Sequence, residues 1–322
     1  MFFYLVSYSF CLGLIGAWVA KKFAHKLGII DVPSERSSHD RSIPKCGGIG
    51  IVIAFAVGSV ILPVSSGLWL PALSIAVLSL WGGDKHCLSP AVRLISQFVC
   101  SMIFLVSFIY LEQMHIDFYA LCIPLAIFIV GTSNFYNFMD GIDGIAGITG
   151  VIGFSLLYLY NTMFINNPIA GELCLVFTFS CLGFLCFNFP KAKVFLGDVG
   201  SILLGFVYAC MVIIISENLV DFVILVGFLA LFYLDELSTM AIRISRGDSL
   251  MVPHRRHLYQ LLANEGKIDH WKISLGYGLI QMIIGFSGIF FRPLGLGGVL
   301  AVYLFYSTIF ILFSVFIRKR LI

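Results

Sequence analysis

Charged side chains are scarce in this sequence, and their scarcity excludes a soluble fold. Asp, Glu, Lys and Arg make up 11% of the 322 residues, whereas 60% are hydrophobic and the mean hydropathy is +1.01. A soluble domain does not need so much apolar surface, so we expect lipid to surround much of the chain. The apolar runs are long and do not alternate with polar residues. This favours helices over barrel strands, because backbone groups in lipid must be satisfied within their own segment.

Three further absences narrow the class of protein. The nine cysteines are odd in number and include no C-x-x-C pair, so we expect small buried hydrophobes, not disulfides or metal ligands. No basic stretch precedes the first apolar run, and Lys21 and Lys22 follow it, which predicts an uncleaved anchor and not a signal peptide. The net charge is only +3, and membrane topology accounts for the basic residues, so no nucleic-acid partner is expected.

What the sequence does contain is a succession of apolar segments. We expect a single polytopic, all-α integral membrane domain over residues 1–322, with about eleven transmembrane helices. The predicted segments are 2–20, 47–63, 67–82, 93–110, 119–136, 145–162, 171–187, 200–216, 220–242, 273–291 and 295–317. With the amino terminus outside, every Lys and Arg except Arg292 falls in an inside loop or the inside tail. The positive-inside rule therefore predicts the amino terminus out, the carboxyl terminus in, and functional loops that face the cytoplasm.

Two carboxylates and two asparagines lie close together in the stretch Asn134 to Gly144, with the sequence N-F-Y-N-F-M-D-G-I-D-G. Carboxylates and asparagines beside a membrane core are costly unless they serve a site, and Asp-Gly steps suit a turn that approaches a ligand closely. We expect this turn to form one wall of a site for a phosphorylated substrate. The candidate residues here are Asn134, Asn137, Asp140, Gly141 and Asp143.

Two earlier inside loops carry further candidates. Residues 21–48 form a dense polar loop that includes Arg41 and Lys45 and ends at Gly47-Gly48; it is either a basic linker facing anionic lipid or a substrate-binding loop. The second loop begins Gly82-Gly83-Asp84. Asp84 could act as a base or hold a cation, and the alternative is a helix cap.

The later loops add cations and one more acid. G-D-V-G-S places Asp198 at a helix start that favours phosphate, so we expect the aspartate to reach phosphate through Mg²⁺; a plain helix cap is the alternative. Asp235 and Glu236 form an acidic pair inside an apolar run, either lining the site or pairing with an arginine. In the last loop, His254 and His257 would share a helix face. Two histidines are too few for zinc, so phosphate contacts by these histidines, Arg255 and Arg256 fit better.

Taken together, these motifs resemble the polyprenyl-phosphate N-acetylhexosamine-1-phosphate transferase superfamily, glycosyltransferase family 4. The resemblance rests on N-F-M-D-G-I-D-G, then N-F-P-K-A-K-V-F-L-G-D-V-G-S, then the histidine-containing last loop, with P-K-C-G-G and L-S-P in their usual places. It implies transfer of a sugar phosphate from a UDP-N-acetylhexosamine to undecaprenyl phosphate, with release of UMP and a need for Mg²⁺, or Mn²⁺ in its place. It also implies a bacterial cytoplasmic membrane as location; a homodimer is permitted but not required.

The resemblance further implies individual roles. Asp198 matches the metal-binding aspartate, Asn188 and Phe195 match positions that line the uridine pocket, and Gly141 and Asp143 match contacts to uracil. Asp140 would lie beside the sugar or ribose. His254 and His257 would lie near the phosphates, and Asp84 matches the second member of an aspartate pair that acts on the prenyl phosphate.

Gly83 departs from the pattern, because the family usually has an aspartate there. The departure questions a mechanism that needs that residue as base, although the acceptor phosphate, with a second pKa of about 6, is largely ionised without one. The form H-R-R-H-L-Y-Q resembles the O-antigen-initiating subgroup, whose donors include UDP-GlcNAc, UDP-QuiNAc and UDP-FucNAc. The alternatives are a catalytically inactive relative, or a transporter or flippase of a lipid-linked sugar; the lack of an internal repeat and the one-sided polar motifs count against transport.

Overall fold

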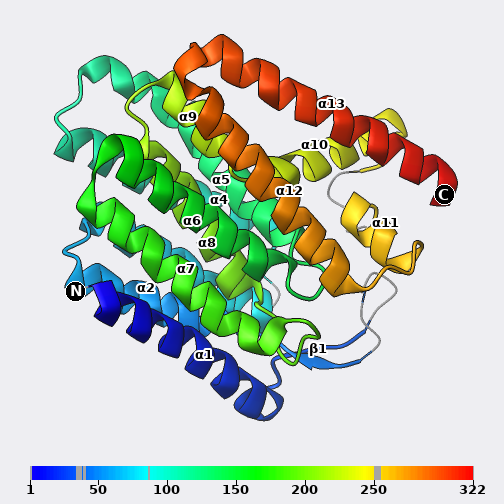
Figure 1. Ribbon diagram of the computed structural model, residues 1–322. Coiled ribbons are helices and arrows are strands. Elements are labelled where there is room, and N and C mark those ends of the chain that lie inside the picture. The colour runs from blue at the N-terminus through cyan, green and yellow to red at the C-terminus, as the bar shows by residue number, and fades with distance from the viewer. Residues whose placement is uncertain (1, 34–37, 39–40, 86–87, 250–254, 322) are drawn as a thin grey trace.

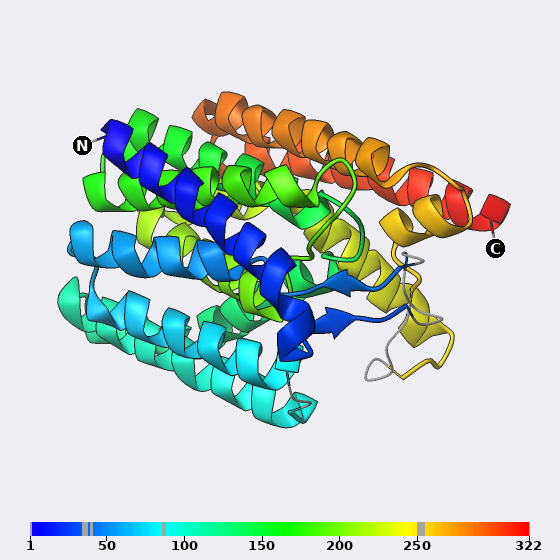
Figure 2. The same cartoon turned by 90° about the horizontal axis from the view of Figure 1, so that it is seen from below.

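The computed structural model describes residues 2–33, 38, 41–85, 88–249 and 255–321, and for Asp84, Lys85 and Ile116 it describes only the backbone. Over these ranges the fold is a bundle of long helices with one small hairpin (Figures 1 and 2). The α-helices are α1 (Phe2–Leu27), α2 (Ile49–Ile61), α3 (Ser66–Ser79), α4 (Pro90–Leu111), α5 (Cys122–Phe138), α6 (Ile145–Tyr160), α7 (Pro168–Asn188), α8 (Asp198–Ile215), α9 (Leu219–Gly227), α10 (Ala230–Ser245), α11 (Leu258–Asn264), α12 (His270–Phe291) and α13 (Gly295–Leu321). The hairpin pairs β1 (Ile30–Asp31) with β2 (Ile43–Pro44) in antiparallel register, Ile30 opposite Pro44.

The helical prediction is confirmed, and each predicted apolar segment coincides with a helix or a pair of helices. Among the described residues, eight stretches are long and apolar enough to cross a membrane, the last of them being α12 and α13 taken together. Helix α2 has only 13 residues and falls below that length. The count of eleven spans and their orientation therefore stay predictions.

The outer faces of the bundle suit lipid as solvent. Large apolar side chains lie exposed on the peripheral helices α1, α2, α4, α12 and α13, among them Phe3 and Val60, which are each about 80% exposed. Exposed apolar surface on this scale marks a membrane-facing protein. Its distribution agrees with the low charge content of the sequence.

Helix α8 is the core of the bundle. Every residue of α8 is buried except Asp198 and Ile214, and the helix packs against α3 and α5, with α2, α6 and α9 around it. A helix that is apolar on all sides is expected to be buried on all sides. The consequence for function is that Asp198, the first residue of this central helix, is held in a fixed place at one end of the bundle.

The ninth apolar segment is not the continuous helix that we expected over residues 220–242. It divides into α9 and α10 at Phe228–Leu229. Gln281 of α12 bonds both sides of the break: its Nε2 donates to the carbonyl of Gly227 (2.9 Å), and its Oε1 accepts from the amide of Leu231 (3.0 Å). A helix can break inside an apolar bundle only where a neighbour satisfies the freed backbone groups, and Gln281 does so here.

The polar loops gather at one end of the bundle. The hairpin, α11 and the carboxyl terminus lie together, and the amino terminus lies at the opposite end (Figures 1 and 2). The ends of α5, α7 and α10 and the starts of α4, α6, α8 and α12 meet at the same end through the contacts described below. At the far end, Arg292 forms an ion pair with Asp221 (3.0 Å), and Tyr160 donates to the same carboxylate (2.6 Å).

Candidate active site

Asp198 forms the centre of the polar end of the bundle. It is the first residue of α8, and Gly197 before it has φ 78°, a conformation that favours glycine. Arg93, in the first turn of α4, forms an ion pair with Asp198, with 2.7 Å between Nη2 and Oδ2. Both side chains are about one quarter exposed. In the sequence, Arg93 stands out only as a basic residue that contributes to the predicted topology, and its pairing with Asp198 was not predicted.

Gly83 packs directly against Asp198. A Cβ added at Gly83 would overlap Oδ2 of Asp198 and lie 2.8 Å from its Cβ. A side chain at position 83 would therefore have to displace the side chain of Asp198. The side chain of Asp84 lies outside the described part of the chain, so its predicted role stays a prediction.

Two asparagines of the N-F-Y-N stretch tie α5 to its neighbours. Asn134 donates to Oε1 of Gln97 in α4 (2.6 Å), and Ser201 of α8 donates to Oδ1 of Asn137 (2.6 Å). Both asparagines thus bond across helices, one turn apart, at the end of α5. Their substrate contacts remain predictions, but these bonds tie the end of α5, which leads into the turn, to α4 and to the first turn of α8.

Asn188 fixes the end of the turn Asp140–Gly144 by a hydrogen bond to its backbone. Gly144 has φ 84°, and its amide donates to Oδ1 of Asn188 (2.9 Å), while Nδ2 of Asn188 donates to the carbonyl of Val194 (2.9 Å). Asn188 is 3% exposed. Its amide group therefore joins the turn to the loop that leads into α8, and its predicted contact with uridine is not tested here.

The first loop pairs with the segment before α8. The amides of Gly47 and Gly48 donate to the carbonyls of Phe195 (2.8 Å) and Leu196 (2.9 Å), and the amide of Phe195 donates to the carbonyl of Pro44 (2.8 Å). A Cβ on Gly48 would meet the backbone of Gly200, so the Gly-Gly step permits this approach. Lys45 forms an ion pair with Asp31 across the hairpin (3.2 Å between Nζ and Oδ1). The loop is thus part of the site's framework.

A cavity of about 750 Å³ opens between the first loop, the Asp140–Gly144 turn, the loop after α7 and the start of α12. Arg41, Lys191 and Lys267 bring positive charge to its wall, and Asp143 and His270 line another part. Its remaining lining residues include Phe189 and Trp271. Cations beside aromatic side chains suit a ligand that carries phosphates and a planar base.

His270 holds Asp143 at the edge of this cavity. Its Nδ1 lies 3.4 Å from Oδ2 of Asp143 and accepts from the amide of Asp143 at 3.4 Å, and Ser274 donates to the carbonyl of Asp143 (2.7 Å). The sequence analysis did not single out His270 or Trp271. The only available signal was their position directly after Asp269 at the start of an apolar run.

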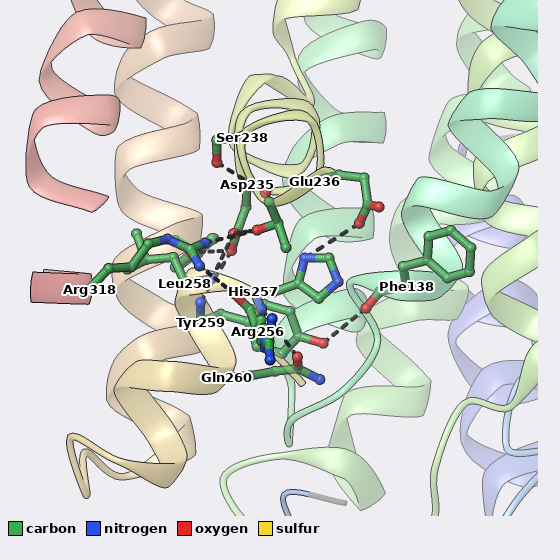
Figure 3. Close-up of polar contacts among 12 residues, drawn as sticks. Phe138, Asp235, Glu236, Ser238, Arg256, His257, Leu258, Tyr259, Gln260 and Arg318 are labelled. Carbon is green, nitrogen blue, oxygen red and sulfur yellow. Dashed lines mark hydrogen bonds and ion pairs between the residues drawn. The ribbon is translucent and has the colours of Figure 1, made fainter. Parts of the chain in front are cut away.

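The last loop differs from expectation. Helix α11 begins only at Leu258, so His257 is the residue directly before a helix; His254 lies outside the described residues, and the predicted common face is therefore not tested. The ring of His257 is 4% exposed, and its Nδ1 lies 3.4 Å from Oε2 of Glu236 (Figure 3). Burial lowers the pKa of His257 to about 3, and the nearby Arg318 and Arg243 add to the shift. The ring is therefore neutral and enclosed, and it does not lie on an open phosphate site.

The arginines of that loop have different surroundings. Arg256 forms an ion pair with Asp248 (2.6 Å), and its carbonyl accepts from Arg318 (2.7 Å), whereas the side chain of Arg255 is exposed. Asp235 accepts hydrogen bonds from the first two amides of α11. The predicted phosphate contacts of Arg255 and Arg256 are not tested by these contacts.

Asp198 fits a role as one ligand of Mg²⁺. Among the residues that the structure describes, no cluster contains three or more His, Cys, Asp or Glu side chains suited to a metal. Magnesium commonly takes one or two carboxylates and completes its octahedron with water and substrate phosphates. A single carboxylate, held by Arg93 at the edge of the site, is compatible with that mode of binding.

Comparison with known proteins places these residues in a wider setting. A family model described as glycosyl transferase family 4 matches residues 66–216, a range that contains Gly83, Arg93, Asn188 and Asp198. The chain is 27% identical over 286 residues to a probable undecaprenyl-phosphate N-acetylglucosaminyl 1-phosphate transferase of Bacillus subtilis (strain 168), covering 84% of this chain and 79% of that protein.

Two further relatives carry another transferase name. The chain is 28% identical over 277 residues to a phospho-N-acetylmuramoyl-pentapeptide-transferase of Staphylococcus epidermidis (strain ATCC 12228 / FDA PCI 1200), covering 75% of this chain and 85% of that protein. It is 33% identical over 204 residues to a phospho-N-acetylmuramoyl-pentapeptide-transferase of Staphylococcus aureus (strain JH9), covering 58% and 61%. The resemblance drawn from the motifs is thereby confirmed at the level of the family.

Proposed function

We propose that this chain, which matches a glycosyl transferase family 4 model over residues 66–216, transfers an N-acetylhexosamine 1-phosphate from a UDP-sugar to undecaprenyl phosphate and releases UMP. The observation that carries the proposal is the position of Asp198. The central helix presents this carboxylate, paired with Arg93, at the polar end of the bundle, and Ser201 in the first turn of the same helix bonds Asn137 at the end of α5. A lipid-linked acceptor and a soluble donor can meet only at such an end.

The chemistry needs little more than positioning and charge. An oxygen of the acceptor phosphate attacks the sugar-bearing phosphorus of the donor, the bond from that phosphorus to the bridging oxygen breaks, and UMP leaves with that oxygen. The acceptor is already ionised near neutral pH, so no protein base is required. Mg²⁺, when bound, supplies charge neutralisation on the donor diphosphate.

The residues of this chain divide that work. Arg93 orients the Asp198 carboxylate and adds positive charge where phosphates collect. The cavity lined by Arg41, Lys191 and Lys267 would take the donor, with Asp143 and His270 at its edge. Because these groups come from five separate segments, the site exists only in the folded bundle.

The remaining expectations form part of the proposal. Charge bias supports eleven spans with the amino terminus outside and the site facing the cytoplasm of a bacterium. The form of the last loop supports a role in initiating a surface polysaccharide of the O-antigen type, with UDP-GlcNAc, UDP-QuiNAc or UDP-FucNAc as donor.

The test is release of UMP by the purified protein with undecaprenyl phosphate, Mg²⁺ and a panel of UDP-N-acetyl sugars, with EDTA as control. We expect release that depends on both lipid and metal. Asp198→Asn should reduce turnover by about 100-fold or more, because it weakens the hold on Mg²⁺, whose positive charge would stabilise the transition state. Asp117→Asn, a change of an exposed acid away from the site, is the matched control. Normal turnover by Asp198→Asn would remove the metal role, and no release from folded wild-type protein with any donor would overturn the transferase.

A further inference from the structure

Asp235 is a fully buried carboxylate whose hydrogen bonds all lead to the last loop or to the helices around it. Oδ1 accepts from the amide of Leu258 (2.7 Å) and from Thr239 (3.4 Å). Oδ2 accepts from the amide of Tyr259 (3.2 Å) and from the hydroxyl of Tyr277 (2.8 Å). The first two amides of α11 have no partner within their own helix, so Asp235 caps that helix from α10 (Figure 3).

The same cap positions Tyr259 against the Asp140–Gly144 turn. The hydroxyl of Tyr259 donates to the carbonyl of Phe138 (2.9 Å), the last residue of α5 before the turn (Figure 3). It also lies against Gly141, where an added Cβ would overlap the hydroxyl and lie 3.1 Å from Cζ. Tyr259 is completely buried, so it cannot change place without disturbing both contacts.

We propose that Asp235 is a positioning residue, which caps α11 and, through Tyr259, holds the Asp140–Gly144 turn in its functional shape. The catalytic consequence rests on the proposed transferase function, but the structural link does not. Asp235 is not placed to bind substrate, because both of its oxygens already accept two hydrogen bonds each. The presence of Asp235 within an apolar run is explained by its hydrogen bonds to the start of α11.

The link can be measured without any activity. In hydrogen–deuterium exchange of the purified protein, Asp235→Asn leaves one backbone amide of α11 without its acceptor. We expect exchange about tenfold faster in peptides that cover residues 258–264 and also in peptides that cover residues 138–144. Asp221→Asn, which removes an equally buried carboxylate at the far end of the bundle, should leave both peptides unchanged. Unchanged exchange in either peptide of Asp235→Asn would overturn the proposal.

A double-mutant cycle then connects the link to turnover. Gly141→Ala should lower kcat by about tenfold or more, because the new methyl group displaces the Tyr259 hydroxyl and with it the turn. Tyr259→Phe keeps the ring and frees the space that the hydroxyl filled, so it should cost less alone and restore part of the activity when combined with Gly141→Ala. A general loss of stability would not produce that rescue.

The outcomes separate the two proposals. A double variant no more active than Gly141→Ala would show that the contact with Tyr259 does not set the turn, and would overturn the positioning role. If wild-type protein releases no UMP, the transferase fails and the exchange measurement alone decides the role of Asp235.

Discussion

At the scale of single residues, Gly83 is interpreted differently in the sequence and in the fold. In the sequence it stands where the family usually has a carboxylate, whereas in the fold its lack of a side chain leaves room for the side chain of Asp198. Two residues that are 105 positions apart, Arg93 and Asp198, form an ion pair at this place. No local pattern could have revealed this pairing.

The first prediction at this scale concerns Gly83. Gly83→Ala and Gly83→Asp should each lower turnover by about tenfold or more, because a Cβ there must push Asp198 away from its position. The measurement is UMP release per folded protein. Gly276→Ala is the matched control, since a Cβ added at Gly276 in α12 meets no atom within 4 Å. A gain of activity in Gly83→Asp would instead favour an inactive natural protein that lacks its first aspartate.

His257 is buried, although the sequence suggests an accessible phosphate ligand. Its spacing from His254 suggests a shared helix face, yet the ring is buried and adjacent to Glu236, directly before the helix begins. The sequence could not show this burial, because Glu236 belongs to a different helix and meets His257 only when α10 packs against α11.

At the scale of elements, the amino-acid composition does not predict the break between α9 and α10. Residues 220–242 form an apolar run with no proline, so they suggest one helix. The break is allowed because Gln281 from α12 supplies one donor and one acceptor at the right places. The tertiary partner, and not local propensity, decides where this segment ends.

The break leads to a prediction of stability. Gln281→Leu keeps the side-chain size but leaves the carbonyl of Gly227 and the amide of Leu231 buried without that partner. We expect a loss of about 3 kcal/mol, seen as a lower midpoint for thermal unfolding in detergent. Gln113→Leu, at an exposed site, should shift the midpoint little. An unchanged midpoint in Gln281→Leu would mean that other groups or water satisfy the break.

At the scale of the whole molecule, acid should weaken the fold through His257. Burial, reinforced by Arg318 and Arg243, lowers its pKa to about 3, whereas the unfolded chain has the ordinary value of 6.5. Between these two values the unfolded chain binds a proton here that the folded chain does not. Stability at this site is therefore full above pH 6.5 and falls as the pH drops below it, by about 2 kcal/mol at pH 5.

The measurement is the unfolding midpoint from pH 7.5 to 4.5 for wild type and His257→Gln. We expect a shallower decline in His257→Gln, and no such change in His115→Gln, which alters an exposed histidine at the far end. Glu236, at 3.4 Å, is the acid that faces His257, and Arg243 and Arg318 are the cations that oppose its protonation. Parallel declines in wild type and His257→Gln would show that other groups control the acid response.

The sequence by itself determined that lipid surrounds much of this protein, where its helical segments lie, and that its polar motifs fall in every second loop between them. These properties depend on composition and on short spacings, since apolar length dictates a membrane helix and Asp-Gly steps dictate a turn. The motifs N-F-M-D-G-I-D-G and G-D-V-G-S were enough to indicate the family, which the comparisons then confirmed. The prediction that Asp198 lies at a helix start is confirmed, because a start beside glycines is a local feature, whereas its role in binding Mg²⁺ stays a prediction.

Only the tertiary structure decided which residues meet. The pairing of Arg93 with Asp198, the hold of His270 on Asp143, and the cap that Asp235 places on α11 all join separate helices. Such contacts depend on how the helices pack in three dimensions, and packing depends on the shape of every neighbour at once. For this reason Asp235, which the sequence suggests could line the site, is proposed instead to position the turn through α11 and Tyr259.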